Sequence, residues 1–343
     1  MIVMITGASA GVGRATARVF AAHGWDVAVL ARNKARLDAA VDELRSQGVR
    51  ALPLVADVAD FKAVQAAAAE AERDLGPIDV WVNNAMATVF APVDRITPGE
   101  FRRATEVTYL GQVHGTMVAL ALMRPRNRGT IVNVGSALSY RAIPLQSVYC
   151  GAKYAVRGFT DSLRSELIHD RSAVKLAMVH LPALNTPQFD WALNRTGRRA
   201  QPVPPIFQPE VAARAIHFAA MHPERREVWV AMPTVQAIVA NKIAPGLLDH
   251  YLAKSGYSGQ LTREPLPPDA PSNLFDSVDA DVAAHGRFDA KASGASWEMA
   301  LSRSRGFAVT LAAGLIAGGL IAFYGARNRR RALLPDRRLR AAE

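Results

Sequence analysis

The chain has 343 residues, 50% of them hydrophobic and 21% charged, which is typical of a globular protein that buries a sizeable core. Its single cysteine, Cys150, excludes an intramolecular disulfide and gives no sign of an oxidising compartment. Of the formal charge of +11, residues 303–343 supply a net +7 from nine arginines and two acids, so the other residues carry only +4 and a nucleic-acid-binding face is not indicated.

A short apolar run, Ile2–Thr6, leads into a glycine-rich turn over Gly7–Gly13 and then into a helical stretch. Glycines allow a backbone to approach a pyrophosphate, and the N-terminus of the following helix offers free N–H groups and a positive dipole end. The order of strand, glycine turn and helix therefore predicts a dinucleotide-binding site. Because a strand is expected from the second residue, we also expect no secretory signal.

Apolar runs alternate with helical stretches through the first two-thirds of the chain. Strands are expected at Ile2–Thr6, Asp26–Ala31, Arg50–Ala56, Ile78–Asn83, Gly129–Val134, Val174–Leu181 and Glu227–Ala231. Helices are expected between them, including Phe61–Leu75 and one long helix over Pro98–Met123. This alternation predicts an α/β fold, a doubly wound parallel sheet of about seven strands with helices on both faces. Ligands bind such sheets at the carboxyl ends of the strands, where Asn84, Ser136 and Thr186 fall.

Tyr149 and Lys153 are four residues apart in a helical stretch, so they share one face of a helix. A phenol is a poor acid or base at neutral pH, and an ammonium held nearby lowers its pKa toward the working range. The Ser136 hydroxyl can hold a substrate oxygen while the proton moves. These three residues form the predicted catalytic set, for proton exchange with an alcohol or carbonyl oxygen.

These motifs resemble those of the short-chain dehydrogenase/reductase family in order and spacing, from Met1 to about Met232. The family's marks stand here as Thr6-Gly7-Ala8-Ser9-Ala10-Gly11-Val12-Gly13, Asp57-Val58, Asn83-Asn84-Ala85, Ser136, Tyr149 to Lys153, and Pro182 to Pro187. The resemblance implies a Rossmann-type fold, a nicotinamide cofactor and assembly as a homodimer or homotetramer. The expected cofactor-binding residues, two arginines included, are Gly7, Ser9, Ala10, Gly11, Val12, Gly13, Arg14, Arg32, Asp57, Val58, Asn84, Tyr149, Lys153 and Thr186.

The second expected strand ends at Ala31-Arg32, where NAD-preferring relatives carry an acidic residue for the ribose hydroxyls. No acid stands there, and Arg14 and Arg32 are expected near the 2′-phosphate. Because a guanidinium binds a phosphate through paired charge-assisted hydrogen bonds, we expect NADP(H) in preference to NAD(H). NAD(H) is the alternative if both arginines are ordinary surface charges.

Three positions depart from the family pattern. Met86 replaces a glycine beside the cofactor, and Ala183 replaces a glycine after Pro182. Thr108 stands where many relatives have an asparagine whose backbone carbonyl helps to hold a proton-relay water. Threonine keeps that carbonyl, so we expect activity to survive, while the role of Thr108 itself is open.

Residues 189–207 occupy the place of the family's substrate lid. Phe189, Trp191 and Leu193 suit an apolar substrate. The following arginines, Arg195, Arg198 and Arg199, either face an anionic substrate or lipid or, the reading we favour, form a solvated basic loop. The eight histidines show no metal-ligand spacing, so no metal is expected.

After Met232 the chain continues beyond the family pattern. Val235–Leu252 is expected to form an amphipathic helix interrupted at Pro245-Gly246, and Ser255–Ser296 has the composition of a linker that is free or laid across the domain surface. Gly306–Ala326 has no charge and at ~1.5 Å per residue spans about 31 Å, enough to cross a bilayer. The expected domains are 1–232 (catalytic), 233–302 (extension) and 303–343 (transmembrane helix and basic tail).

Arginines flank the expected span on both sides. The positive-inside rule favours a cytoplasmic tail, whereas the cofactor favours a cytoplasmic catalytic domain. We expect the catalytic domain to be cytoplasmic, attached by a single pass or by a helix lying obliquely in the inner leaflet with both arginine clusters on the headgroups.

The leading interpretation is a membrane-anchored, NADP(H)-dependent oxidoreductase that acts on a hydroxyl or carbonyl carbon of a small, apolar or lipid-like molecule. Tyr149 exchanges the proton, Lys153 tunes the Tyr149 pKa and holds the nicotinamide ribose, and Ser136 positions the substrate oxygen. The alternative is a non-catalytic NADP(H)-binding scaffold or sensor tethered to a membrane, which Met86 and Thr108 suit. The sequence predicts no nucleic-acid partner and leaves the substrate, reaction direction and oligomeric state open.

Overall fold

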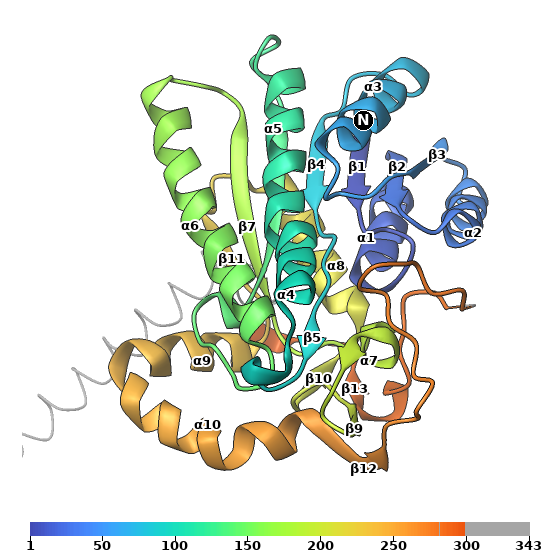
Figure 1. Cartoon of the computed structure of the whole chain (residues 1–343). Coiled ribbons are helices and arrows are strands. Elements are labelled where there is room, and N and C mark those ends of the chain that lie inside the picture. The colour runs from blue at the N-terminus through green and yellow to red at the C-terminus, as the bar shows by residue number, and fades with distance from the viewer. Residues whose placement is uncertain (281, 299–343) are drawn as a thin grey trace, which may run out of the picture. The chain divides into compact units, whose positions relative to one another are not determined.

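A seven-stranded parallel sheet organises the structure, with the strand order β11-β7-β6-β4-β1-β2-β3 (Figure 1). Its strands are β1 (Ile2–Thr6), β2 (Asp26–Ala31), β3 (Ala51–Val55), β4 (Val80–Asn83), β6 (Thr130–Ser136), β7 (Lys175–Leu181) and β11 (Glu227–Trp229). The predicted α/β class and the seven predicted strands are confirmed, with strand ends that shift by no more than two residues.

The computed structural model describes residues 1–280 and 282–298, so the predicted span Gly306–Ala326 and the basic tail lie outside the described residues. Within the described part of the chain, no helix is both long enough and apolar enough to cross a membrane. Met1–Ser296 form one compact unit, which extends past the boundary that the sequence places at residue 232.

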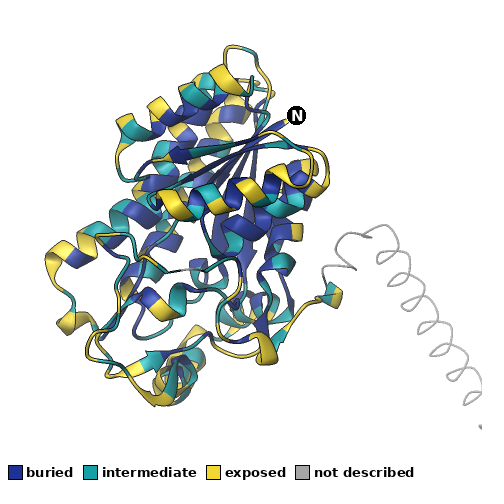
Figure 2. Ribbon diagram, turned by 90° about the vertical axis from the view of Figure 1, so that its right-hand side faces the viewer, coloured by how far each residue is buried: buried dark blue, intermediate teal, exposed yellow. Residues whose placement is uncertain are grey.

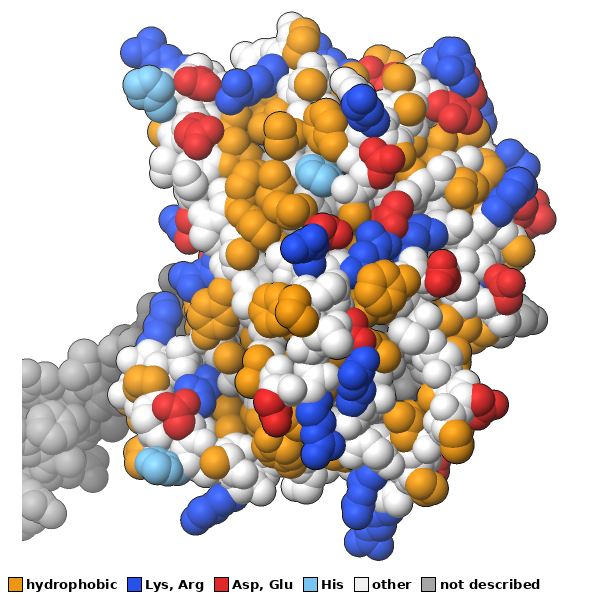
Figure 3. Space-filling model, in the orientation of Figure 1, with side chains coloured by type: hydrophobic (Ala, Val, Ile, Leu, Met, Phe, Trp, Pro, Cys, Tyr) orange, Lys and Arg blue, Asp and Glu red, His pale blue; other side chains and the backbone are white. Residues whose placement is uncertain are grey.

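Helices cover both faces of the sheet (Figure 1). On one face α1 packs against α2 and α8, and on the other α5 packs against α3 and α6. Their bounds are α1 (Gly11–Ala22), α2 (Lys34–Arg45), α3 (Phe61–Asp74), α4 (Pro98–Thr105), α5 (Gly111–Met123), α6 (Ser147–His169) and α8 (Pro209–Met221). The strands are buried between helices that expose their outer faces (Figure 2), while hydrophobic side chains also gather on the outer face formed by α4, α5 and α6 (Figure 3).

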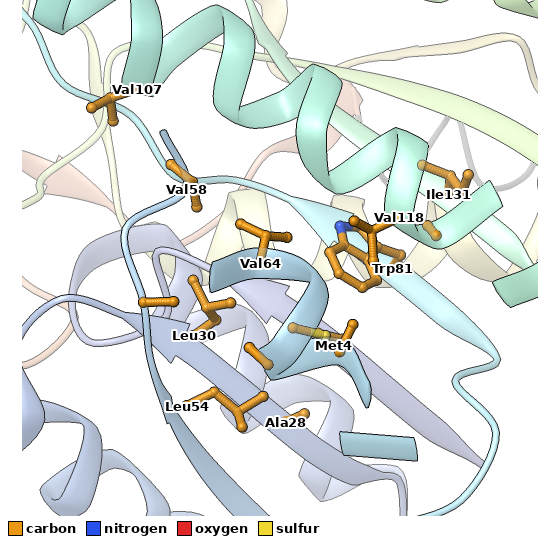
Figure 4. Packing of buried hydrophobic residues seen from close by; sticks show 14 of the residues in the cluster. Met4, Ala28, Leu30, Leu54, Val58, Val64, Trp81, Val107, Val118 and Ile131 are labelled. Carbon is orange, nitrogen blue, oxygen red and sulfur yellow. The ribbon is translucent and has the colours of Figure 1, made fainter. Parts of the chain in front are cut away.

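The core explains why the strands are apolar on both faces. Met4 and Ile5 of β1 are fully buried because helices cover each side of the sheet, as in parallel sheets generally. Met4, Trp81, Val118 and their neighbours form one cluster that joins the sheet to α3 and α5 (Figure 4). The alternating βα pattern thus yields a rigid platform whose carboxyl edge can hold a site.

The prediction of one continuous helix over Pro98–Met123 is wrong, because the structure divides this stretch into two α-helices. The helix α4 begins with a capping box between Thr97 and Glu100, and a π-helical segment, η2 (Glu106–Leu110), separates it from α5. A side chain on Gly111 would come within 2.6 Å of Val58 Cγ2, so the small residue allows α5 to approach the loop after β3. This irregular turn lies beside the carboxyl edge, where π-bulges are often functional.

The region after residue 232 is more ordered than a linker. The predicted helix with its interruption is found as α9 (Met232–Ile243) and α10 (Pro245–Gln260), although α10 runs eight residues past the predicted end. The short strand β12 (Leu261–Pro265) pairs with β9 (Arg198–Ala200), and β13 (Ala292–Ser293) pairs with β10 (Ile206–Phe207). Two parts of the stretch predicted as a linker are therefore paired with the domain, which agrees with a segment laid across its surface.

Candidate active site

A cavity of about 430 Å³ lies at the carboxyl edge of the sheet. It contains thirteen of the fifteen predicted site residues: Gly7, Ser9, Ala10, Gly11, Val12, Arg32, Asp57, Val58, Asn84, Ser136, Tyr149, Lys153 and Thr186. Residues far apart in the sequence thus meet along one cleft. We call the part around Ser136, Tyr149 and Lys153 the catalytic end, and the part around Arg32, Asn33 and Arg36 the arginine end.

Gly13 and Arg14 do not line the cavity. A side chain at Gly13 would come within 2.2 Å of the Gly7 carbonyl oxygen, so this glycine serves the close packing of α1 against the turn. The buried Arg14 guanidinium pairs with Glu43 at 2.6 Å and donates to the Val282 carbonyl at 3.3 Å. Arg14 is therefore engaged outside the cavity, and Arg36 takes its place beside Arg32 at the arginine end.

The glycine turn between β1 and α1 has the geometry of an anion site. Gly7 and Gly11 have φ values of +67° and +57°, which side-chain-bearing residues rarely adopt. Ala10 stands at the N-cap of α1, and within the described residues no side chain caps this helix end or places an acid in its first turn. The positive end of α1 therefore faces the cavity, where a phosphate would be stabilised.

The catalytic end is built from β6 and α6. Ser136 ends β6, and its Oγ accepts a hydrogen bond from the Leu138 N–H at 3.1 Å. Tyr149 and Lys153 lie in the first turns of α6, with the Lys153 Nζ 5.6 Å from the centre of the Tyr149 ring. The Lys153 amine, 1% exposed, donates to the Val134 carbonyl at 2.7 Å. The predicted set is thus assembled in one place.

Burial controls the protonation of this pair, and the expected lowering of the Tyr149 pKa is wrong for the chain alone. Burial raises the Tyr149 pKa, and the hydrogen bond with Ser136 opposes that rise without outweighing it. Burial also lowers the pKa of Lys153 to about 7, because the charged amine loses its hydration. At neutral pH the phenol is therefore protonated and the amine is only partly charged.

A ladder of buried amides holds the sheet under the catalytic end. The Asn83 Nδ2 donates to Thr116 Oγ1 and to Asn133 Oδ1, each at 2.9 Å, and the Asn133 Nδ2 donates to Thr160 Oγ1 at 2.9 Å. These bonds join β4 and β6 to α5 and α6. Because every donor is satisfied in a buried place, the ladder fixes the register of the elements that carry Ser136 and Tyr149.

Two of the residues singled out near the cofactor have structural roles. The Asn84 Nδ2 donates to the Thr6 carbonyl at 3.0 Å, which joins the ends of β4 and β1 at the cleft. The buried Thr108 Oγ1 donates to the Ala87 carbonyl at 2.6 Å and accepts from the Ala87 N–H at 2.9 Å. Thr108 therefore clamps the loop after β4 to the π-helical segment.

A polar cluster that the sequence did not indicate lies behind Ser136. The His180 Nδ1 is 3.1 Å from the Ser136 carbonyl oxygen, and its Nε2 is 3.6 Å from Glu227 Oε2. Glu227 also accepts a hydrogen bond from Tyr140. Burial raises the Glu227 pKa, but contacts with His180, Tyr140 and Trp229 outweigh it and hold the pKa well below its usual range.

Two of the three apolar lid residues lie at the cavity, as expected. Phe189 and Trp191 line the cavity, as do Pro202, Val203, Pro204 and Pro205. Leu193 does not, because it forms β8 (Leu193–Asn194) and packs against the core. Arg195 pairs with Glu100, and Arg199 lies 3.6 Å from Glu264. Arg195 and Arg199 thus lie against the protein's own acids, and none of the three lid arginines lines the cleft.

The extension supplies residues that sequence reasoning missed. Gln146 lines the cavity near Tyr149, and its Nε2 donates to Oε1 of the fully buried Gln260 at 2.7 Å. Gln260 in turn donates to the Pro144 carbonyl at 2.8 Å, so the end of α10 braces the loop before α6. Only Arg36 had a readable signal, since it is a second arginine four residues after Arg32, in the first turn of α2.

The arginine end is closed by the chain itself. Asn273 and Ser277 line the cavity beside Arg32, Asn33 and Arg36. Asp57 pairs with Arg103 at the same end. Within the described residues, no group of three or more His, Cys, Asp or Glu side chains is placed to hold a metal ion.

Comparison with known proteins gives the family context. The profile described as short chain dehydrogenase matches residues 1–194. The chain is 33% identical over 278 residues to "Uncharacterized oxidoreductase YxnA" of Bacillus subtilis, covering 80% of this chain and 78% of that protein. It is 36% identical over 172 residues to dehydrogenase/reductase SDR family member 7B of Rattus norvegicus, which covers 48% of this chain and 53% of that one.

Solved structures agree with this context. A short-chain dehydrogenase from Streptomyces avermitilis superposes with a TM-score of 0.60 at 27% identity, over 74% of this chain and 94% of that one. An alcohol dehydrogenase from the archaeon Thermococcus sibiricus, complexed with 5-hydroxy-NADP, gives a TM-score of 0.58 at 25% identity, over 67% and 95%. Nearly the whole of each structure is matched, while a quarter to a third of this chain lies outside the match.

Proposed function

The chain belongs to the short chain dehydrogenase family of nicotinamide-dependent oxidoreductases, and from this premise we propose that it is an NADP(H)-dependent enzyme acting on a hydroxyl or carbonyl carbon of an apolar or lipid-like substrate. One observation carries the proposal. Ser136, Tyr149 and Lys153 line the same cavity as the glycine turn and the Arg32 guanidinium.

The residues of the cleft suit a nicotinamide dinucleotide. The N-terminus of α1 suits its pyrophosphate, since among the residues that the structure describes no side chain caps it and only its Gly11 N–H is engaged, by the Ala283 carbonyl at 3.0 Å. The cleft continues from there in both directions, to the catalytic end and to the arginine end. Arg32 and Arg36 at the latter favour a cofactor with a 2′-phosphate over one without it. When bound, the nicotinamide supplies or accepts the hydride.

The chain's own residues manage the proton. Because burial keeps the Tyr149 phenol protonated, it is ready to donate to a carbonyl oxygen during reduction. The Ser136 hydroxyl lies beside it to hold that oxygen. As Tyr149 loses its proton, the charged form of Lys153 stabilises the phenolate, so the amine acts in the state that exists below its pKa of about 7.

The test of this assignment is the substitution Tyr149→Phe, followed by NADPH oxidation with a panel of ketones and aldehydes. We expect turnover to fall about 1,000-fold, because the proton donor is lost, while NADPH affinity is retained. Tyr154→Phe is the matched control, since Tyr154 lies on the same helix, is 41% exposed and donates to the Tyr140 carbonyl outside the cavity. Turnover retained by Tyr149→Phe would reject the assignment, and a wild-type protein that binds NADPH but turns over no substrate would favour the scaffold.

The lining of the lid supports an apolar substrate. Phe189 and Val203 face the cavity together with Met86 and Ala237, and none of these side chains offers a charge, whereas Trp191 lies 4.8 Å from the Arg36 guanidinium at the arginine end. Binding free energy becomes more favourable as more apolar substrate surface is buried against such a lining. We expect kcat/KM to rise with chain length in a series of aliphatic ketones, and a preference for acidic substrates would contradict the proposal.

Anchoring to a membrane is part of the proposed function. The uncharged stretch Gly306–Ala326 with arginines on both sides supports it, and the catalytic domain is proposed to be cytoplasmic because NADPH is supplied there. Fractionation of cells expressing the full chain should find it with membranes. A chain ending at residue 302 should be released, and its continued sedimentation with membranes would contradict the anchor.

Assembly of two copies is likewise proposed. The face formed by α4, α5 and α6 exposes Phe101, Met117 and Ile168, an apolar group that a second copy could cover (Figure 3). Light scattering of the detergent-solubilised protein should give the mass of a dimer or tetramer. Met117→Glu should shift it to monomer, and an unchanged mass would exclude this face.

A further inference from the structure

A segment of the extension, residues 272–280, crosses the arginine end of the cleft; we call it the strap. Arg32 donates to the carbonyls of Phe275, at 2.5 Å, and of Asn273. Arg36 donates to the Val278 carbonyl. The guanidinium groups that favour a 2′-phosphate are thus already used to hold the strap in place.

Side chains extend this contact on both sides. The Asn33 Nδ2 donates to Asp279 Oδ1 at 2.8 Å, and the Arg103 Nε donates to the Leu274 carbonyl at 3.0 Å. Burial lowers the pKa of Arg32 and of Arg36, and the nearby carboxylates of Asp276 and Asp279 respectively oppose that shift. The strap therefore brings two acids to a cluster of cations, a charge match that favours the closed position.

The strap is fixed by one buried anchor. Leu274 is fully buried within the main core cluster, whereas its neighbour Phe275 is 56% exposed. After residue 281 the chain continues to the glycine turn, where the Gly11 N–H donates to the Ala283 carbonyl at 3.0 Å. The backbone of the extension thus covers the cleft from the end of β2 to the start of α1.

The covered cleft is not filled. The cavity runs beneath the strap, and Asn273 and Ser277 form part of its wall next to Arg32. A dinucleotide that enters or leaves through the arginine end meets a wall held by Arg32, Arg36 and Leu274. Passage requires those contacts to break.

Resting on the proposed function, we infer that the strap is a lid over the dinucleotide site: it detaches from Arg32, Arg36 and its Leu274 anchor to admit NADP(H) and closes again over the bound cofactor. Its opening then limits both association and release. Slow exchange of a tightly enclosed cofactor follows from this arrangement, because lid motions rather than contacts set the rates.

The test is the substitution Leu274→Ala in the full chain in detergent, with NADPH binding and release followed by stopped-flow fluorescence. We expect both rate constants to rise about tenfold or more, with a much smaller change in Kd, because a lid that opens more often speeds passage in both directions. Phe275→Ala is the matched control, since it removes an exposed side chain of the same strap and keeps the carbonyl. Its rates should stay within about twofold of wild type.

A second variant guards against a merely misfolded protein. Asp276→Asn with Asp279→Asn leaves the core intact but removes both charges and perturbs the Asn33–Asp279 hydrogen bond, so it should accelerate exchange about threefold at low salt and less at high salt. Wild-type rate constants in both variants would overturn the inference, as would a tighter Kd with unchanged release, which indicates a strap that competes with the cofactor instead of enclosing it. A wild-type protein that binds no NADPH would refute the proposed function itself.

Discussion

The two ends of the cleft are closed by different kinds of structure. The catalytic end comes from β6 and the first turns of α6, over a ladder of buried amides. The arginine end comes from β2 and α2, and its outer wall is a strap more than 230 residues further along the chain. One end is therefore part of the core, whereas the other is completed by a surface segment.

This difference separates the part of the cleft that transfers a proton from the part through which the cofactor enters and leaves. A group that transfers a proton must keep its position, and the fully buried Asn83–Asn133 pair provides that stability. A cofactor must enter and leave, and part-buried bonds to backbone carbonyls can break and re-form at low cost. The following changes test whether the two ends are as independent as this division requires.

After Tyr149→Phe, the largest effect is expected from Lys153 at the catalytic end. Its folded-state pKa of about 7 means that the ammonium is present below that pH and lost above it. The rate of carbonyl reduction should therefore fall as the pH rises through about 7. Lys153→Met should lower the rate about 100-fold or more at pH 6, because the phenolate loses its stabilising charge.

Lys153→Arg distinguishes charge from fit, since a guanidinium stays charged throughout this range. The falling limb near pH 7 should disappear from its pH–rate profile, whatever its maximal rate. A limb that persists unchanged in this variant would assign the titration to another group. NADPH exchange rates measured in parallel should not show that limb if the ends are independent.

At the arginine end, Arg32→Ala should weaken NADPH binding about 10- to 100-fold and NADH binding much less, because one charge-assisted pair with the 2′-phosphate is lost. The value of kcat at saturating NADPH should change little. Calorimetric titration with both cofactors provides the measurement. Arg18→Ala is the control, since Arg18 pairs with Glu43 outside the cavity; equal losses for NADPH and NADH would contradict the assigned preference.

A smaller effect is expected where the extension braces the catalytic end. Gln260→Ala leaves the Gln146 amide without its partner in a buried place, so KM should rise several-fold and the melting temperature should fall by a few degrees. Steady-state kinetics and thermal unfolding measure the two. Ser258→Ala, an exposed change in the same helix, should alter neither. An unchanged KM would confine Gln260 to stability.

The smallest effect concerns His285, which ties the chain beyond the strap to α8. Its Nε2 is 2.9 Å from Glu210 and its Nδ1 is 2.8 Å from Asp289. Burial lowers its pKa, but these two carboxylates outweigh burial and raise the pKa above its usual value. The contact is thus complete below the unfolded pKa and is lost as the pH rises through the folded one.

NADPH release should accordingly become modestly faster as the pH rises through the raised His285 pKa, by no more than about threefold because the side chain is well exposed. His285→Gln should remove that dependence and leave the pH dependence of turnover intact. Stopped-flow release measured across the pH range checks this. A steeper dependence in the variant would point to another group.

Local pattern was sufficient for the sheet and the catalytic set. Apolar runs of strand length between helical stretches placed all seven strands, because burial on both faces of a parallel sheet leaves a continuous apolar signature. Tyr149 and Lys153 could be paired from their spacing, since one helical turn brings them to the same face. Thirteen of the fifteen predicted site residues line the cavity for the same reason, because strand ends share one edge.

Other features had no local signature. The π-helical break at Thr108 depends on a loop 21 residues away, and Arg14 could not be separated from Arg32 before Glu43 was seen to pair with it. The predicted pKa of Tyr149 had the wrong direction because sequence spacing gives neighbours but not burial.

What the sequence by itself determined is therefore the order of the elements and the chemistry carried on their ends, since both follow from periodicity and residue type. Only the tertiary structure decided that Ser255–Ser296, with the composition of a linker, supplies a wall of the cleft. Its contacts with Arg32 and Arg36 are made through backbone carbonyls, and its contacts with buried side chains through Leu274, Ala284 and Phe288. Every residue has a backbone carbonyl, so the side chains in the sequence do not show which carbonyls accept hydrogen bonds from Arg32 and Arg36.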